Sequence, residues 1–138
     1  MQIKINDEKY DLYFGFDFIN YIDEHYPVKI QFQGIDVPFG SALNTTINAL
    51  EKDERPTDLI KILKAGMVTL KSKPSNKDLE KYISELIENE EYDEFVKELL
   101  GKLKKTPLIK KEIESLNKKT KETNVTEEEA LEFLKQMN

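Results

Sequence analysis

Apolar and polar residues alternate at the start of the chain. Ile3 and Ile5 come before the polar run Asn-Asp-Glu-Lys, and Tyr10, Leu12 and Phe14 occupy every second position after it. Two alternating runs on either side of a polar turn are typical of a β-hairpin. A lone hairpin is only marginally stable in water, so we expect the apolar face of this one to pack against helices.

The apolar spacing then changes from two residues to three or four. Phe14, Phe18 and Ile22 recur along one face of a predicted helix, and Pro27 disfavours a helical conformation at the residue before it. Residues 28–37 are apolar at every second position as far as residue 32, which favours a strand or an extended loop around Gly34.

Four further segments carry a helical stripe of apolar residues, at positions 42–50, 59–70, 79–87 and 95–103. Pro38 or Ser41 lies near the start of the first, and Thr57 is a candidate N-cap for the second, which Pro74 stops. Ser75 is a candidate N-cap for the third. Residues 108–116 permit another helix, 117–124 have the composition of a solvated linker, and a capping box at 126–129 precedes a short last helix.

These patterns predict an α+β fold that is mainly α. In it, a short N-terminal β-hairpin packs on a bundle of about five to six helices. Apolar residues become sparser after Pro107. We therefore divide the chain into a body over residues 1–107 and a helical or partly flexible C-terminal extension over residues 108–138.

Charge and composition narrow the classes of function. Of the 138 residues, 35% are charged, and the net charge is -6, a sign that repels nucleic-acid phosphates unless the basic residues cluster. The chain has no Cys, which excludes disulfides and thiolate chemistry. The N-terminus has no signal-peptide pattern and no apolar run is long enough to span a bilayer, so we expect no membrane contact.

Residues that could perform catalysis are few. His25 is the single histidine and follows Asp23 and Glu24, so an enzyme around Asp17 and His25 is the weakest of three hypotheses. A histidine at a helix end is more often structural. The chain also lacks a phosphate-binding glycine loop and an EF-hand loop, and we predict no catalytic residue, cofactor or metal.

A second hypothesis is a small DNA-binding regulator with a helix-turn-helix over residues 57–88. The exposed face of its second helix mixes Lys77 and Lys81 with Glu80 and Glu85. Residues 56–105 contain ten lysines and ten acidic residues, and Arg55 is the only arginine of the chain. Because specific DNA contacts favour a basic surface and arginine, this pattern argues against a nucleic-acid partner.

Several segments, in their order and spacing, carry a resemblance to a known family. They are the opening IKINDEKYDLYFGFDFINYIDE, the central GIDVPFGSAL, and the later PTDLIKILKAGM, KPSNKDLEKYISEL and YDEFVKELLGKLKKTP. Together they resemble the tail assembly chaperones of long-tailed phages, in the form found in phages and prophages of low-GC Gram-positive bacteria. The resemblance covers roughly residues 1–107 and rests on core patterns rather than on chemistry.

The resemblance implies a non-enzymatic role in tail morphogenesis. Its implied partners are the tape measure protein and the major tail (tube) protein, with self-association as a further contact. It implies action in the cytoplasm of the bacterial host and absence from the mature virion. A longer form made by frameshifting occurs often in such families.

The residues themselves suggest where a partner binds. Leu131, Phe133, Leu134 and Met137 form an apolar stripe near the C-terminus, which we take as the first candidate for partner binding. Packing of this stripe on its own domain is an equally open reading. A second candidate is the apolar region near Val37 and Phe39, for which core packing is the favoured reading.

Overall fold

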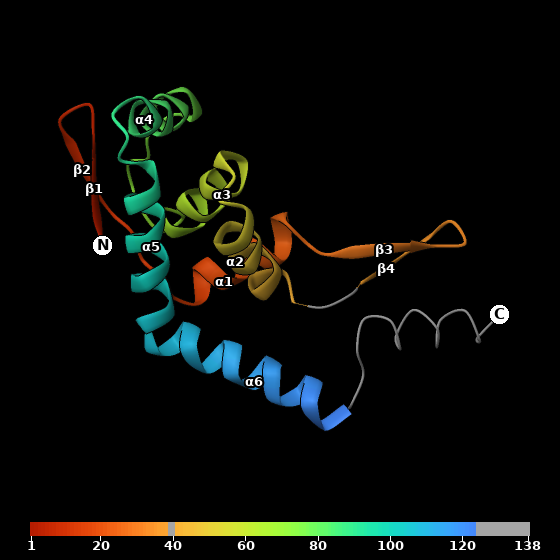
Figure 1. Ribbon diagram of the computed structural model, residues 1–138. Helices are drawn as coiled ribbons and strands as arrows, with labels where there is room; N and C mark the ends of the chain where they lie inside the picture. The colour runs from red at the N-terminus through yellow and green to blue at the C-terminus, as the bar shows by residue number, and fades with distance from the viewer. Residues whose placement is uncertain (39–40, 124–138) are drawn as a thin grey trace.

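A computed structural model describes residues 1–38 and 41–123 of the protein. Two antiparallel hairpins and six helices make up this part (Figure 1). The strands are β1 (Gln2–Ile5), β2 (Glu8–Asp11), β3 (Lys29–Phe32) and β4 (Ile35–Pro38). The helices are α1 (Phe16–His25), α2 (Ala42–Asp53), α3 (Pro56–Gly66), α4 (Asn76–Glu88), α5 (Tyr92–Lys105) and α6 (Pro107–Thr123). The predicted mainly α class with an N-terminal hairpin is confirmed, and β3–β4 is an additional hairpin.

The N-terminal hairpin packs its apolar face into the helical body as expected. Ile3, Ile5, Tyr10 and Leu12 are all buried, and β1 contacts α4. The segment that follows β2 is tied to the end of α3, because the Tyr13 amide donates to the Gly66 carbonyl at 2.9 Å. These contacts join the first residues of the chain to its middle.

Gly66 allows this close approach. A Cβ at position 66 would lie 3.3 Å from side-chain atoms of both Leu12 and Phe14, which is tighter than ordinary contact. Phe14 in turn packs edge-to-face on Phe18 of α1, with ring centroids 5.2 Å apart. A small residue near the end of α3 is therefore required by packing.

The main core lies among α1, α2, α3 and α5, with α4 and α6 packed at its margins. Each helix contributes the apolar stripe that its sequence predicts. The largest fully buried side chains are Phe18, Ile22, Leu43, Ile47, Leu50, Leu59, Ile62, Leu63, Met67, Leu99, Leu103 and Ile109. Ile109 belongs to α6, so the core reaches beyond residue 107, while the proposed division of the chain there stays a prediction.

Helix boundaries confirm some of the predicted caps and correct others. The Ser41 and Ser75 hydroxyls accept from the amides of Asn44 and Asp78, as N-caps do. Thr57 is not an N-cap, because it is the second residue of α3. The N-cap is Arg55, two residues earlier, and Pro56 takes the first helical position, where the missing amide hydrogen is not needed.

Two helix ends also differ from the prediction. The helix expected to run to residue 70 ends at Gly66, because the Met67 amide turns back to the Lys64 carbonyl and leaves the helical ladder. The expected linker at residues 117–124 is wrong for residues 117–123, which continue α6. Lysine and glutamate are good helix formers, so a polar run of them is compatible with helix as well as with linker.

Candidate interaction surfaces

The imidazole of His25 is held by local contacts. It stacks on the Tyr21 ring at 3.9 Å between centroids, and its Nδ1 lies 3.0 Å from the Tyr21 carbonyl oxygen. Asp17 is exposed at the first turn of the same helix. Within residues 1–38 and 41–123, no group of three or more His, Asp or Glu side chains is placed to hold a metal ion. The geometry gives an acid–base role of His25 and Asp17 no support.

A second polar cluster joins α1 to α3. Asp58 is buried and its carboxylate lies 3.5 Å from the Lys61 ammonium, which itself lies 5.3 Å from the centroid of the Tyr26 ring. Burial, followed by the neighbouring Tyr21, raises the pKa of Tyr26 to about 12. The phenol is therefore neutral at ordinary pH, and the cluster is a structural ion pair with a cation–π contact.

The segment predicted as an alternative DNA reader has the wrong geometry for it. Residues 67–75 separate α3 from α4, whereas a helix-turn-helix joins its helices by a turn of about 3–4 residues. Leu79, Ile83 and Leu86 of α4 are buried in the core. The exposed residues of α4 carry both signs of charge, so α4 presents no basic face.

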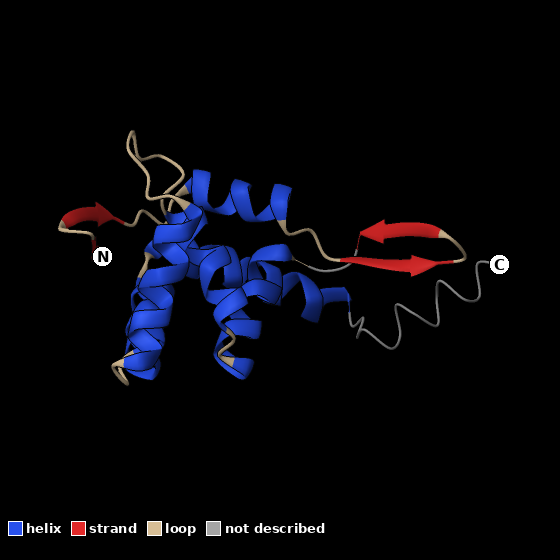
Figure 2. Ribbon diagram, turned by 90° about the horizontal axis from the view of Figure 1, so that it is seen from above, coloured by secondary structure: helices blue, strands red, loops and turns tan. Residues whose placement is uncertain are grey.

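The β3–β4 hairpin, which we call the arm, projects from the helical body (Figure 2). Its register pairs Ile30 with Val37 and Phe32 with Ile35, so these apolar positions share one face of the ribbon. Ile35 is 67% exposed. Among residues 1–38 and 41–123, each of these strands pairs only with the other, so no described strand occupies either outer edge.

Exposed aromatic residues mark a second surface, between β2 and α1. Tyr13 and Phe16 are 55% and 73% exposed, while Phe14 between them is buried. Because the chain passes from a strand into a helix at this point, successive aromatic side chains alternate between solvent and the core. Exposed aromatic side chains are enriched where proteins bind one another.

The third surface is a groove between α2 and α5 of about 460 Å³, the α2–α5 groove. Its apolar floor is formed by Val96 and Leu100, with Gly101 beside them. Its rim is charged: Glu51, Glu54, Asp93, Glu94, Lys97 and Lys104 line it.

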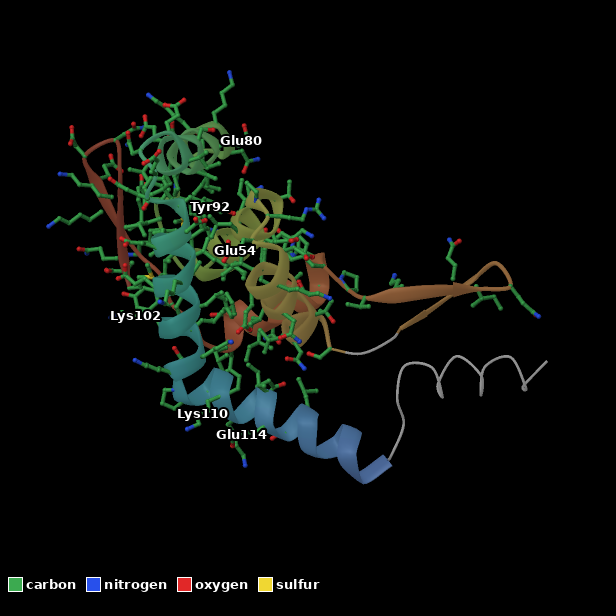
Figure 3. All side chains as sticks on the ribbon, in the orientation of Figure 1. Glu54, Glu80, Tyr92, Lys102, Lys110 and Glu114 are labelled. Carbon is green, nitrogen blue, oxygen red and sulfur yellow. The ribbon has the colours of Figure 1, made fainter. Side chains whose placement is uncertain are left out.

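Tyr92 fixes the upper end of this groove. Its hydroxyl donates to the Glu54 carbonyl at 2.6 Å, which ties the C-cap of α2 to the first turn of α5. Burial and the nearby Glu54 carboxylate raise the pKa of Tyr92 to about 12. The phenol therefore stays protonated and remains a donor across the physiological range of pH. Figure 3 shows Tyr92 and Glu54 together at this end of α5.

The residues predicted to bind a partner lie in different parts of the chain. Leu131, Phe133, Leu134 and Met137 lie outside the described residues, as does Phe39, so the C-terminal stripe stays a prediction. Val37 lies in β4 of the arm. Residues 28–37 were expected to form a strand or an extended loop around Gly34, and they form most of a hairpin with Gly34 in its turn. A glycine between two short apolar runs is the part of a hairpin signal that this segment carries. The α2–α5 groove depends on packing between distant segments and has no local signal.

The chain matches the model of a known protein family. A family model described as phage tail assembly chaperone protein, TAC, matches residues 2–118. No curated protein and no solved structure matches the chain significantly. Within the residues that the structure describes, no helix is long and apolar enough to cross a membrane.

Proposed function

Because the chain belongs to the phage tail assembly chaperone family, we propose that it binds the tape measure protein and the major tail (tube) protein while a tail is assembled. The family match over residues 2–118 is the observation that carries this proposal. Members of the family are generally non-enzymatic, and the surfaces described above suit contacts between proteins.

The proposal includes where the protein acts. It works in the cytoplasm of the bacterial host, where tail proteins are made, and it leaves before the virion is complete. A chaperone of this kind needs contacts that form and then release. Exposed, unpaired structural elements suit such contacts better than an extensive interface.

The arm supports this proposal as a contact site. An extended partner segment that pairs with the free edge of β3 or β4 gains main-chain hydrogen bonds, and the apolar face that includes Ile35 adds buried area. The C-terminal stripe of Leu131, Phe133, Leu134 and Met137 is the second proposed contact, through its apolar spacing.

Co-expression tests the proposal. The full chain carrying an affinity tag is produced together with the tape measure protein, and separately with the tail-tube protein, of the phage that encodes it. We expect co-purification of each. Ile35→Asp should weaken the complexes, while Gln33→Asp, an equal charge on an exposed residue of the turn between β3 and β4, should not. Absence of both complexes with the wild-type chain would overturn the proposal.

The DNA-binding alternative is tested by titration of duplex DNA at several salt concentrations. We expect no binding that saturates, because α4 lacks a basic face. Tight binding that weakens steeply with salt would favour the regulator instead.

A further inference from the structure

A hollow lies between α2 and the first half of α6, and we call it the α2–α6 hollow. Its volume is about 330 Å³. Ile47, which is 1% exposed, and the half-buried Ile113 give it an apolar lining. The rest of its lining is polar and comes from three helices: Asn44 and Asn48 of α2, Lys104 of α5, and Lys110 and Glu114 of α6. An apolar side chain that enters the hollow therefore contacts isoleucine and has a polar rim around it.

The charge of this hollow differs from that of the α2–α5 groove. Two lysines and one glutamate line the hollow, whereas four acidic residues and two lysines line the groove. Lys104 belongs to both linings, and its ammonium lies 2.6 Å from the Glu51 carboxylate. Figure 3 labels Lys110 and Glu114 on α6, and neither belongs to an ion pair within the described part of the chain. The groove thus repels an acidic segment that the hollow accepts.

The C-terminal segment of the chain has a pattern that suits the hollow. Thr126 and Glu129 make a capping box, and the apolar residues that follow recur at helical spacing, so the sequence predicts a helix over residues 127–137. A helix of this length is only marginally stable alone in water and needs a surface for its apolar stripe. The family match ends at residue 118, so this segment lies outside the matched part of the chain.

The length of the chain brings this segment back to the hollow. α6 ends at Thr123, and residues 124–126 separate it from the predicted helix. Antiparallel helices are joined by loops of about 2–5 residues. Residues 113–123 and 127–137 are 11 residues each, which is about 16 Å of helix. The end of an antiparallel second helix, with Leu134 and Met137, therefore lies level with Ile113.

Charges on the two sides of the turn favour the same arrangement. Residues 117–123 contain three lysines and one glutamate, and residues 127–132 contain four glutamates and no lysine. In an antiparallel pair of helices, these two stretches lie beside each other next to the turn. Each exposed ion pair contributes little to stability, but complementary charge favours this orientation of the segment.

We propose that residues 127–137 form a helix antiparallel to α6, with Leu134 and Met137 in the α2–α6 hollow. The proposal decides between the two readings of the C-terminal stripe. In the chain alone, the stripe packs on its own domain.

Docking of the segment also regulates the proposed contact with tail proteins, and this consequence rests on the proposed function. A tail protein that binds the C-terminal stripe must displace it from the hollow. The apparent affinity for such a partner falls in proportion to the fraction of chains in which the stripe is undocked.

Spin labels on two introduced cysteines report the docking, because the chain has no cysteine of its own. Thr45→Cys places one label on an exposed position of α2, next to Asn44 of the hollow. Asn138→Cys places the other label next to the end of the predicted helix. Neither residue lines the hollow or belongs to the apolar stripe. Double electron–electron resonance then measures the distances between the labels in the full chain.

Two variants in the segment separate docking from a general effect of charge. Leu134→Asp replaces a docked side chain with a carboxylate. Gln136→Asp is the matched control, because it adds the same charge on the opposite face of the predicted helix. Both positions lie beyond the core of the described residues, so the helical body should fold in each variant, and circular dichroism confirms it.

We expect a narrow peak at short distance in the labelled chain and in its Gln136→Asp form. Leu134→Asp should abolish this peak and leave a broad distribution at longer distances. The peak should persist when the labelled chain is diluted into an excess of unlabelled wild type, since both labels belong to one molecule.

Three outcomes overturn the inference. A broad distribution in the labelled chain means that the segment does not dock. Loss of the peak on dilution means that the segment contacts another copy instead. An equal effect of Leu134→Asp and Gln136→Asp means that the apolar stripe does not hold the segment. Because no tail protein is present in these measurements, the co-expression experiment tests the proposed function independently.

Discussion

The two hairpins of the protein share a length and a turn conformation but differ in what their apolar faces contact. Both have strands of four residues joined by two residues with positive φ: Asn6 and Asp7 in the first, Gln33 and Gly34 in the second. Positive φ at both central residues defines a type I′ turn, whose twist suits a hairpin.

The two hairpins differ in how exposed their apolar side chains are. Ile3 and Ile5 are each 5% exposed beneath α4, whereas Ile35 is 67% exposed on the projecting arm. Alternating apolar residues and the turn residues between them thus determine locally that a hairpin forms. Whether its apolar side chains are buried depends on the elements that surround the hairpin. The first hairpin is part of the core, and the arm is available to a partner.

The largest expected effect is on the buried hairpin. Ile5→Ala removes a side chain from the core and leaves a cavity, so the free energy of unfolding should fall by about 2–5 kcal/mol. Urea unfolding followed by circular dichroism measures it. A loss below about 0.5 kcal/mol, the size expected of a surface position, would show that this hairpin is no more integrated than the arm.

The next effect should stay within the arm. Gly34 has a φ of 80°, so Gly34→Ala strains the turn and should destabilise the hairpin locally by about 1 kcal/mol. Hydrogen exchange of the arm amides should become faster while the midpoint of global unfolding stays the same. A large drop in the global midpoint would mean that the arm is coupled to the core.

A smaller effect of the opposite sign is expected at the first turn. Asp7 has a φ of 65°, a conformation that strains a residue with a side chain. Asp7→Gly relieves this strain but makes the unfolded chain more flexible, so the free energy of unfolding should rise by a net amount of about 0.5 kcal/mol. The Lys4–Asp7 ion pair that is lost spans 3.7 Å between exposed groups and contributes little. Urea unfolding should therefore detect a slight stabilisation, and a clear destabilisation would contradict it.

The smallest expected change in stability is at the tip of the arm. Ile35→Ala should alter the free energy of unfolding by less than about 0.5 kcal/mol, because the side chain is exposed. Its effect should appear in the co-purification assay as weaker retention of tail proteins. Marked destabilisation together with unchanged retention would assign Ile35 a structural role.

Much of the fold follows from local patterns. The stripes of α1, α2, α4 and α5 and the serine caps of two helices were predicted because each depends on residues close in sequence. Thr57 was misassigned because a proline at the first helical position competes with a hydroxyl cap one residue later, and in this chain Pro56 prevails.

The candidate surfaces were less accessible to sequence reasoning. The α2–α5 groove forms only when α2 and α5 pack, and the Tyr92 to Glu54 contact joins residues 38 positions apart. The arm had a local sequence pattern. Its exposure depends on which other elements pack over it, and a local pattern does not contain that information. The C-terminal stripe was visible in the sequence and stays a prediction.

The role in tail assembly is tested most directly by deletion in the phage or prophage that encodes the chain. Electron microscopy of lysates counts assembled tails with the gene absent, and with wild type, Ile35→Asp or Gln33→Asp supplied in trans. We predict no tails without the protein, full recovery with wild type and Gln33→Asp, and reduced recovery with Ile35→Asp. Normal tails in the absence of the protein would contradict the account.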